Sequence, residues 1–381
     1  MRNFLFITFS IFSFIFLNSC AADVYDVSSS NKYYVIRYSA SNPRPDRASV
    51  VSVGKTPNLQ VYAESGYSYS LQNVRQVVQK FEENYMQMTN IYGAHTDVDN
   101  NGKIKLLFVD INVNNSGDSV VMGYFLPNDL IYGSANNGEI LYMDINLLNS
   151  NPDVIAGTVL HEFQHLINFN VNYLKKGKEM SLWLNECLSE STSVLFDDNI
   201  VKSRINEFNN IKYYCFYTWN LPYPYQNYFV NYPSASVFMN WLYIKNGRNS
   251  DIFKRIASSS QIQDYDKVLK SVSESSTWQN LLTDWIEGIK SGSVYGARIN
   301  TLTSAKLYPG ALIYDGSQVR VNPSTELSNF SYITVSKANS ISGRSAINND
   351  EEEINLQNTE NNQKTKYIDL VFDINGKIRE Y

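Results

Sequence analysis

Two histidines four residues apart most constrain how this chain can fold. His161 and His165 flank the stretch His-Glu-Phe-Gln-His, in which Glu162 follows the first histidine. Residues four apart on an α-helix project from the same face, so both imidazoles can bind one metal ion. The pattern predicts a helix that carries a zinc site, with Glu162 close to it.

The flanking residues predict where this helix begins and which side is buried. Asn151 suits the N-cap and Pro152 the first helical position. We expect one side to be buried, because apolar residues then recur at helical spacing. They are Ile155, Val159, Leu160, Phe163, Leu166 and Ile167.

A second helix is predicted to complete the metal site, because a catalytic zinc ion usually has three protein ligands. Ser181 can cap a helix in which Glu186 and Glu190 lie four residues apart and share a face. Glu186 is the expected third ligand. Glu190 is the expected second carboxylate, which accepts a hydrogen bond from a liganding histidine.

The two motifs together resemble the gluzincin metallopeptidases, whose type is thermolysin. Glu186 follows His165 after twenty intervening residues. More narrowly, His-Glu-Phe-Gln-His-Leu-Ile-Asn-Phe and Trp-Leu-Asn-Glu resemble the hyicolysin family of neutral metallopeptidases, within a likeness that covers residues 65–290. The resemblance implies one zinc ion per chain, held by His161, His165 and Glu186, with Glu162 as general base. Cys187 stands where these sequences usually have glycine.

The resemblance also implies a donor that stabilises the oxyanion. Thermolysin-type enzymes take a histidine from far downstream of the zinc motif, where this chain has none. His95 precedes the motif, and we expect it in a surface turn. Tyr232 is the predicted donor, because it precedes a predicted apolar helix over residues 237–244, and Tyr228 and Tyr225 are the alternatives.

The N-terminus predicts export. Arg2 is followed by an apolar run over residues 4–17, which has the length of a signal-peptide core. Leu-Asn-Ser-Cys then resembles a bacterial lipobox, which implies lipid modification of Cys20 and anchoring at the cell envelope. The alternative is a plain secretory signal cleaved after Ser19 or Ala22. No later apolar stretch reaches membrane-spanning length, so any membrane contact is expected through the lipid alone.

Cysteine content and net charge bear on two further questions, whether the chain has a disulfide and whether it binds nucleic acid. Cys187 and Cys215 can form one disulfide, although Cys187 is expected to be buried packing rather than a metal ligand. The formal net charge of −5 comes without a basic stripe, so no nucleic-acid partner is predicted.

The patterns predict an α+β fold with a two-lobed zincin catalytic domain, in which a mixed sheet and the zinc helix lie above a helical lobe. Strands are expected at 33–39, 48–54, 59–64, 103–110, 139–144, 311–314 and 330–335. Helices are expected at 70–90, 237–245, 251–257, 267–272 and 278–289, besides the two zinc helices. The predicted divisions are a signal peptide (1–19), a tether and small N-terminal β lobe (20–64), the catalytic domain (65–300), and a C-terminal β domain (301–381) with a mobile loop at 348–366.

An acidic turn precedes one of these strands. Asp97, Asp99, Asn101 and Gly102 match the start of an EF-hand loop, but Phe108 occupies the twelfth position, where a bidentate glutamate belongs. A true EF-hand is excluded. A tight turn and a Ca²⁺-binding loop of another type remain the two interpretations.

The strand before the zinc helix is predicted to form the edge of the cleft and to align a peptide by main-chain hydrogen bonds. Glu139 also lies at about the distance from the zinc motif at which gluzincin aminopeptidases bind a free amine, but their Gly-x-Met-Glu-Asn signature is missing. The predicted edge strand comprises Glu139, Ile140, Leu141, Tyr142, Met143 and Asp144.

These patterns predict a zinc endopeptidase acting on extracellular or host proteins. Two alternatives remain: an aminopeptidase of the same type, and a non-catalytic adhesin or binding lipoprotein that keeps the zincin scaffold. Blocking the N-terminus of a peptide would abolish cleavage by an aminopeptidase but not by an endopeptidase. A non-catalytic binding protein would bind zinc but cleave no substrate.

Overall fold

A computed structural model shows how these segments are arranged. The residues that it describes are 31–38, 43–113, 119–131, 133–219, 228–272, 277–302, 304–307, 310–321, 333–336 and 366–371. The architecture is mixed α/β, compatible with the predicted α+β class.

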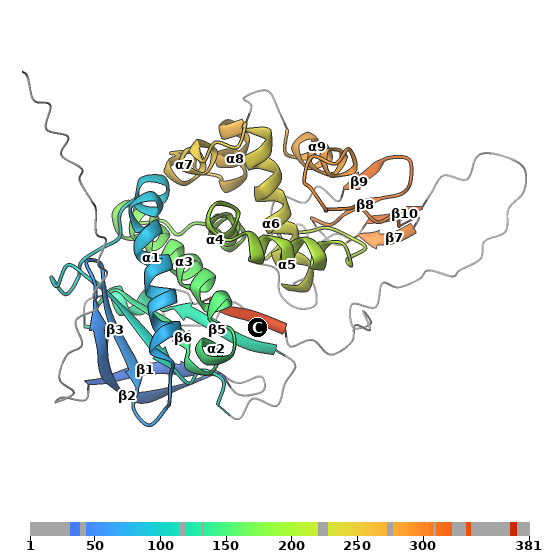
Figure 1. Ribbon diagram of the computed structural model, residues 1–381. Coiled ribbons are helices and arrows are strands. Elements are labelled where there is room, and N and C mark those ends of the chain that lie inside the picture. The colour runs from blue at the N-terminus through green and yellow to red at the C-terminus, as the bar shows by residue number, and fades with distance from the viewer. Residues whose placement is uncertain are drawn as a thin grey trace, which may run out of the picture.

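A seven-stranded mixed sheet lies along one side of the molecule, in the order β1-β2-β3-β4-β6-β5-β11 (Figure 1). β3, β4 and β6 are parallel neighbours, β5 runs antiparallel to β6, and β11 pairs with β5 in parallel. The strands are β1 (Asn31–Arg37), β2 (Arg44–Lys55), β3 (Leu59–Glu64), β4 (Ile104–Val109), β5 (Ser119–Phe125), β6 (Ile140–Asp144) and β11 (Lys366–Val371).

The two faces of the sheet contribute to two cores. In β4, Leu106 belongs to the large core shared with the helices, and its neighbour Leu107 belongs to a smaller core on the opposite face. β1 curls over that second face, where the backbone N–H of Ile36 donates to the Tyr124 hydroxyl at 2.7 Å. Burial of both faces explains why β4 is apolar at most positions.

Helices α1 and α3 cover the large-core face of the sheet, and α4 packs against α3 on the side away from it (Figure 1). The helix α6 packs in turn against α4 and α5. The helices are α1 (Leu71–Tyr92), α2 (Ile145–Ser150), α3 (Pro152–Asn168), α4 (Leu182–Phe196), α5 (Asp198–Phe208), α6 (Tyr228–Lys245), α7 (Asp251–Ser258), α8 (Asp264–Val272) and α9 (Trp278–Lys290). Shorter elements are a 3₁₀ turn (Pro127–Leu130), a π-helical continuation of α3 (Phe169–Leu174), β7 (Ser304–Leu307), β8 (Leu312–Tyr314), β9 (Val319–Val321) and β10 (Ile333–Ser336).

The strongly periodic segments form the predicted elements, with bounds shifted by a few residues. Asn151 and Ser181 occupy the N-cap positions of α3 and α4 as predicted, although neither side chain makes a capping hydrogen bond. The sequence patterns do not indicate β5, α2, α5 or the π-helical turn. α6 begins at Tyr228, earlier than the predicted start at residue 237.

The predicted N-terminal strands join the main sheet, and so does β11 from the C-terminal segment. β3 pairs with β4, so the N-terminal strands continue the central sheet. β11 pairs with β5, although the C-terminal segment was expected in a domain of its own. The pairs β8–β9 and β10–β7 do form small sheets after residue 301. The domain boundaries themselves remain predictions.

Several predictions fall on residues outside the described part of the chain. They are the signal peptide with Cys20, and the loop predicted at 348–366 up to residue 365, since Lys366 begins β11. Among the described helices, none has both the length and the apolar character needed to cross a membrane.

Candidate metal centre

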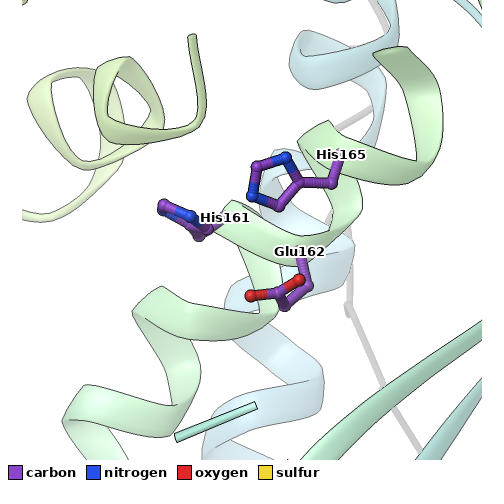
Figure 2. Close-up of side chains that lie close together, drawn as sticks. All are labelled: His161, Glu162 and His165. Atoms are coloured by element: carbon purple, nitrogen blue, oxygen red, sulfur yellow. The ribbon is translucent and has the colours of Figure 1, made fainter. Parts of the chain in front are cut away.

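The helix α3 places His161, Glu162 and His165 together, because its apolar positions are buried as the periodicity predicts. Val159, Phe163 and Leu166 are fully enclosed in the large core. Both histidines are also buried, at 5% and 4% exposure, on the side of α3 that faces α4. One ligand atom from each of the three motif residues lies within 4.8 Å of the others (Figure 2).

Glu186, the predicted third ligand, lies opposite both imidazoles. Its Oε2 atom is 3.4 Å from His161 Nε2, and its Oε1 atom is 3.4 Å from His165 Nε2. Two ligand atoms bound to one tetrahedral zinc ion at about 2.0–2.1 Å lie about 3.3–3.4 Å apart. The spacing of the carboxylate from both nitrogens therefore fits a zinc ion bound between them.

The chemistry of these atoms also fits a metal. The Nε2 atom of His165 is buried and has no hydrogen-bond partner among the described residues. Burial lowers the pKa of His165 to about 4, against the opposing charge of Glu186, so the ring is neutral near pH 7. A neutral imidazole keeps the lone pair that a metal needs.

Ser189 and Asn185 both contact the His165 ring, and Ser189 favours a proton on its Nδ1 atom. The Ser189 hydroxyl donates to Gln164 Oε1 at 2.6 Å, and its oxygen lies 3.1 Å from His165 Nδ1. Because the hydroxyl hydrogen is already directed at Gln164, the oxygen can only accept a hydrogen bond from Nδ1–H. The Nε2 atom is then unprotonated and faces Glu186.

Glu190 lies on the other side of the site, close to His161. Its Oε1 atom is 3.9 Å from His161 Nδ1, and Arg204 binds both of its oxygens in a fork at 2.9 and 3.1 Å. Arg204 comes from α5, which approaches α3 closely at Gly157. A Cβ atom added there would lie 2.2 Å from the Cδ1 atom of Ile200, so a larger residue would force the Ile200 side chain to move.

Burial also affects the acidity of the ligand carboxylate. It raises the pKa of Glu186 to about 7, whereas the nearby His165 and a hydrogen bond from Tyr232 lower it. A bound cation would stabilise the ionised form of Glu186 and so offset the cost of burying its charge.

Tyr232, the predicted oxyanion donor, lies beside His161 of the candidate metal centre. Its ring centre is 6.4 Å from that of His161, and the Arg204 guanidinium lies over the same ring at 4.7 Å. The prediction that Tyr232 precedes its helix is wrong, because the residue lies within α6. Of the alternatives, Tyr228 is half-buried at the start of α6, and Tyr225 is outside the described residues.

A cavity of about 400 Å³ adjoins the centre and reaches His161 and Glu190. Met122 of β5 and Val154 of α3 line its apolar part, and Arg204 lines its polar part. It therefore offers space for a side chain next to the predicted catalytic residues.

The predicted edge strand is not at an edge. β6 lies between β4 and β5 and is buried along its whole length, and it pairs with a strand on each side rather than offering an open edge to a peptide. β5 is the strand next to it, and β11 pairs with its other side. The parallel pairing of β6 with β4, which joins distant segments, could not be foreseen from a short apolar run.

The remaining predicted residues have structural positions. Cys187 and Cys215 are both buried and form no disulfide. His95 is half-buried, and its Nε2 atom lies 2.8 Å from the Tyr85 hydroxyl, with its ring against Phe163. It therefore packs beneath α3 rather than in an isolated surface turn.

Three residues at the candidate centre were not predicted from the sequence: Gln164, Ser189 and Arg204. Ser189 carried a usable signal, because it lies three residues after Glu186 and so shares its helical face. Arg204 carried none, because α5 lacks a strong apolar pattern and its approach to Glu190 depends on packing.

Comparison with known proteins gives one informative similarity. No protein-family model matches the chain. The chain is similar to the neutral metalloprotease ShpI of Staphylococcus hyicus, with 29% identity over 179 residues, which cover 43% of this chain and 40% of that protein. The matched region thus spans about two fifths of the relative's length. The similarity supports a relationship to metallopeptidases.

Proposed function

We propose that this protein is a zinc-dependent endopeptidase of the gluzincin type, with its catalytic domain within residues 65–300. The observation that carries the proposal is the position of Glu186, whose oxygens lie 3.4 Å from the Nε2 atoms of both motif histidines. The relationship to a neutral metalloprotease supports the same chemistry and a protein or peptide substrate.

Each residue of the centre has a role in this proposal. His161, His165 and Glu186 hold one zinc ion, which when bound supplies Lewis acidity toward the peptide carbonyl. Glu162 accepts a proton from the attacking water and delivers it to the leaving amine. Tyr232 donates its hydroxyl hydrogen to the developing oxyanion.

The surrounding residues keep the ligands in place. Ser189 accepts a hydrogen bond from Nδ1–H of His165, and Glu190 faces the Nδ1 atom of His161. Arg204 fixes the Glu190 carboxylate through its two-point contact. The adjoining cavity receives a substrate side chain, and its combination of apolar walls with an arginine favours no single side-chain class.

Two variants test the assigned roles. Glu162→Gln keeps all three metal ligands, so it should retain about one equivalent of zinc and lose about 10²- to 10⁴-fold in turnover. Glu186→Ala removes a ligand, so a mild chelator should strip its zinc, and excess zinc should restore part of the activity. Elemental analysis and casein hydrolysis measure both properties, and the exposed Glu83→Gln serves as the control.

The outcomes separate this function from its alternatives. Normal cleavage by Glu162→Gln would show that another group is the base. Unchanged zinc affinity in Glu186→Ala would assign the third ligand elsewhere. Failure on peptides with a blocked N-terminus would indicate an aminopeptidase, and zinc binding without any turnover would indicate a binding protein.

We also propose export, with anchoring through a lipid on Cys20. The proposal rests on the apolar run before Leu-Asn-Ser-Cys and on the lipobox pattern of those four residues. Metabolic labelling with a fatty acid tests the anchor. Unlabelled protein released into the medium would favour the simple secretory signal.

A further inference from the structure

We propose that the loop over residues 97–103 and the distant Glu139 together form a Ca²⁺ site, separate from the zinc centre. The sequence offers only the first part of a calcium loop, because Phe108 occupies the position of the usual bidentate glutamate. In the structure Phe108 is buried in β4, and Glu139 approaches the loop from the residue before β6.

The loop backbone is folded around its own acidic side chains. The N–H of Gly102 donates to Asp97 Oδ1 at 3.0 Å, the N–H of Asn101 donates to Asp99 Oδ1 at 3.3 Å, and the N–H of Lys103 donates to Asn101 Oδ1 at 2.6 Å. Gly102 has a φ of +67°, the left-handed conformation that the sixth position of a calcium loop requires. Side-chain oxygens at loop positions one, three and five are thereby held in one turn.

Glu139 is the independent observation that indicates a cation. Its side chain is 1% exposed, and one oxygen from each of Asp97, Asp99 and Glu139 lies within 4.8 Å of the others. Glu139 Oε1 accepts the N–H of Val98 at 2.9 Å, whereas Oε2 is buried and has no hydrogen-bond partner among the described residues. A buried carboxylate oxygen without a partner is costly unless a cation binds it.

The charge balance favours a divalent ion. Lys105 places its ammonium 2.5 Å from Asp99 Oδ2, which neutralises one of the three carboxylates. The cluster keeps two negative charges, and one divalent cation balances them. Gly138 allows this arrangement, because a Cβ atom there would lie 2.5 Å from Lys105 Nζ and 2.9 Å from Asp99 Oδ2.

The donor atoms favour Ca²⁺ over other divalent ions. All the side-chain donors are oxygens, whereas zinc sites usually contain nitrogen or sulfur. A turn of the chain together with a carboxylate from another segment suits the variable geometry of Ca²⁺ better than the strict octahedron of Mg²⁺. The ion would join the segment before β4 to the segment before β6, two neighbouring strands of the central sheet.

Calcium titration of the metal-stripped full chain tests the site. Isothermal titration calorimetry with CaCl₂ should show one Ca²⁺ per chain, and Ca²⁺ should raise the Tm by several degrees, whether or not zinc has been restored. Glu139→Gln keeps the size and the Val98 contact but removes the charge, so its Ca²⁺ affinity should fall at least about tenfold. Asp97→Asn, at an exposed position, should show a similar loss, and the exposed Asp284→Asn should not.

Zinc content and casein hydrolysis are measured on the same samples, which keeps this test independent of the proposed peptidase activity. Absence of Ca²⁺ binding by the wild-type protein at millimolar concentration would overturn the proposal, even where Glu139→Gln fails to fold. Equal binding of Mg²⁺ and Ca²⁺ would overturn the assignment of the ion. Unchanged affinity in Asp97→Asn and Glu139→Gln would overturn the assignment of the ligands.

Discussion

Substitution of Ser189 by alanine is expected to weaken zinc binding without removing any ligand. Ser189 accepts a hydrogen bond from Nδ1–H of His165 and donates one to Gln164, which favours an unprotonated Nε2 atom directed at Glu186. Loss of such an outer partner typically weakens metal affinity about 10- to 100-fold. This change corresponds to about 1.4–2.7 kcal/mol.

The same substitution should also reduce the free energy of unfolding of the metal-free protein, by about 1–3 kcal/mol, because Gln164 loses a buried hydrogen-bond donor. Ser191→Ala is a matched control on the same helix. Its hydroxyl is equally buried and contacts Tyr92 and the Leu188 carbonyl rather than the imidazoles. The control should lose comparable stability and keep its zinc affinity.

Competition with a fluorescent zinc chelator measures the affinity, and urea unfolding measures the stability. The role assigned to Ser189 requires that its alanine variant bind zinc more weakly than the Ser191→Ala protein. Equal zinc affinities in the two variants would refute the argument from the His165 tautomer, whatever their stabilities.

Two further predictions concern Tyr232 and Asp129. Tyr232→Phe should keep its zinc and lower kcat about 10²- to 10³-fold with little change in KM, because the lost donor acts on the transition state; steady-state kinetics would contradict this if kcat were unchanged. Burial raises the pKa of Asp129 to about 7, against hydrogen bonds from Tyr142 and Asn136. Its contribution to stability is therefore full below about pH 4 and decreases by about 1.4 kcal/mol per pH unit up to pH 7. Asp129→Asn should remove this part of the pH dependence, and identical slopes of unfolding free energy in the two proteins between pH 4 and 7 would contradict it.

Local sequence patterns predict the two helices of the candidate metal centre and the residues that they present. Apolar spacing on α3 and the four-residue offsets of His161 and His165, and of Glu186 and Glu190, are local properties of a helix. They therefore predict which side chains share a face wherever the helix packs. Local patterns do not place β6, because a short apolar strand can lie at an edge or inside a sheet.

The contacts between elements that are distant in sequence depend on the tertiary structure. It places Arg204 on Glu190 through the close packing of α5 at Gly157, and it inserts β6 between β4 and β5. It also brings Glu139 to a loop about forty residues earlier in the chain. These contacts join segments that are distant in sequence, so no local period encodes them, and they depend on the packing of the whole core.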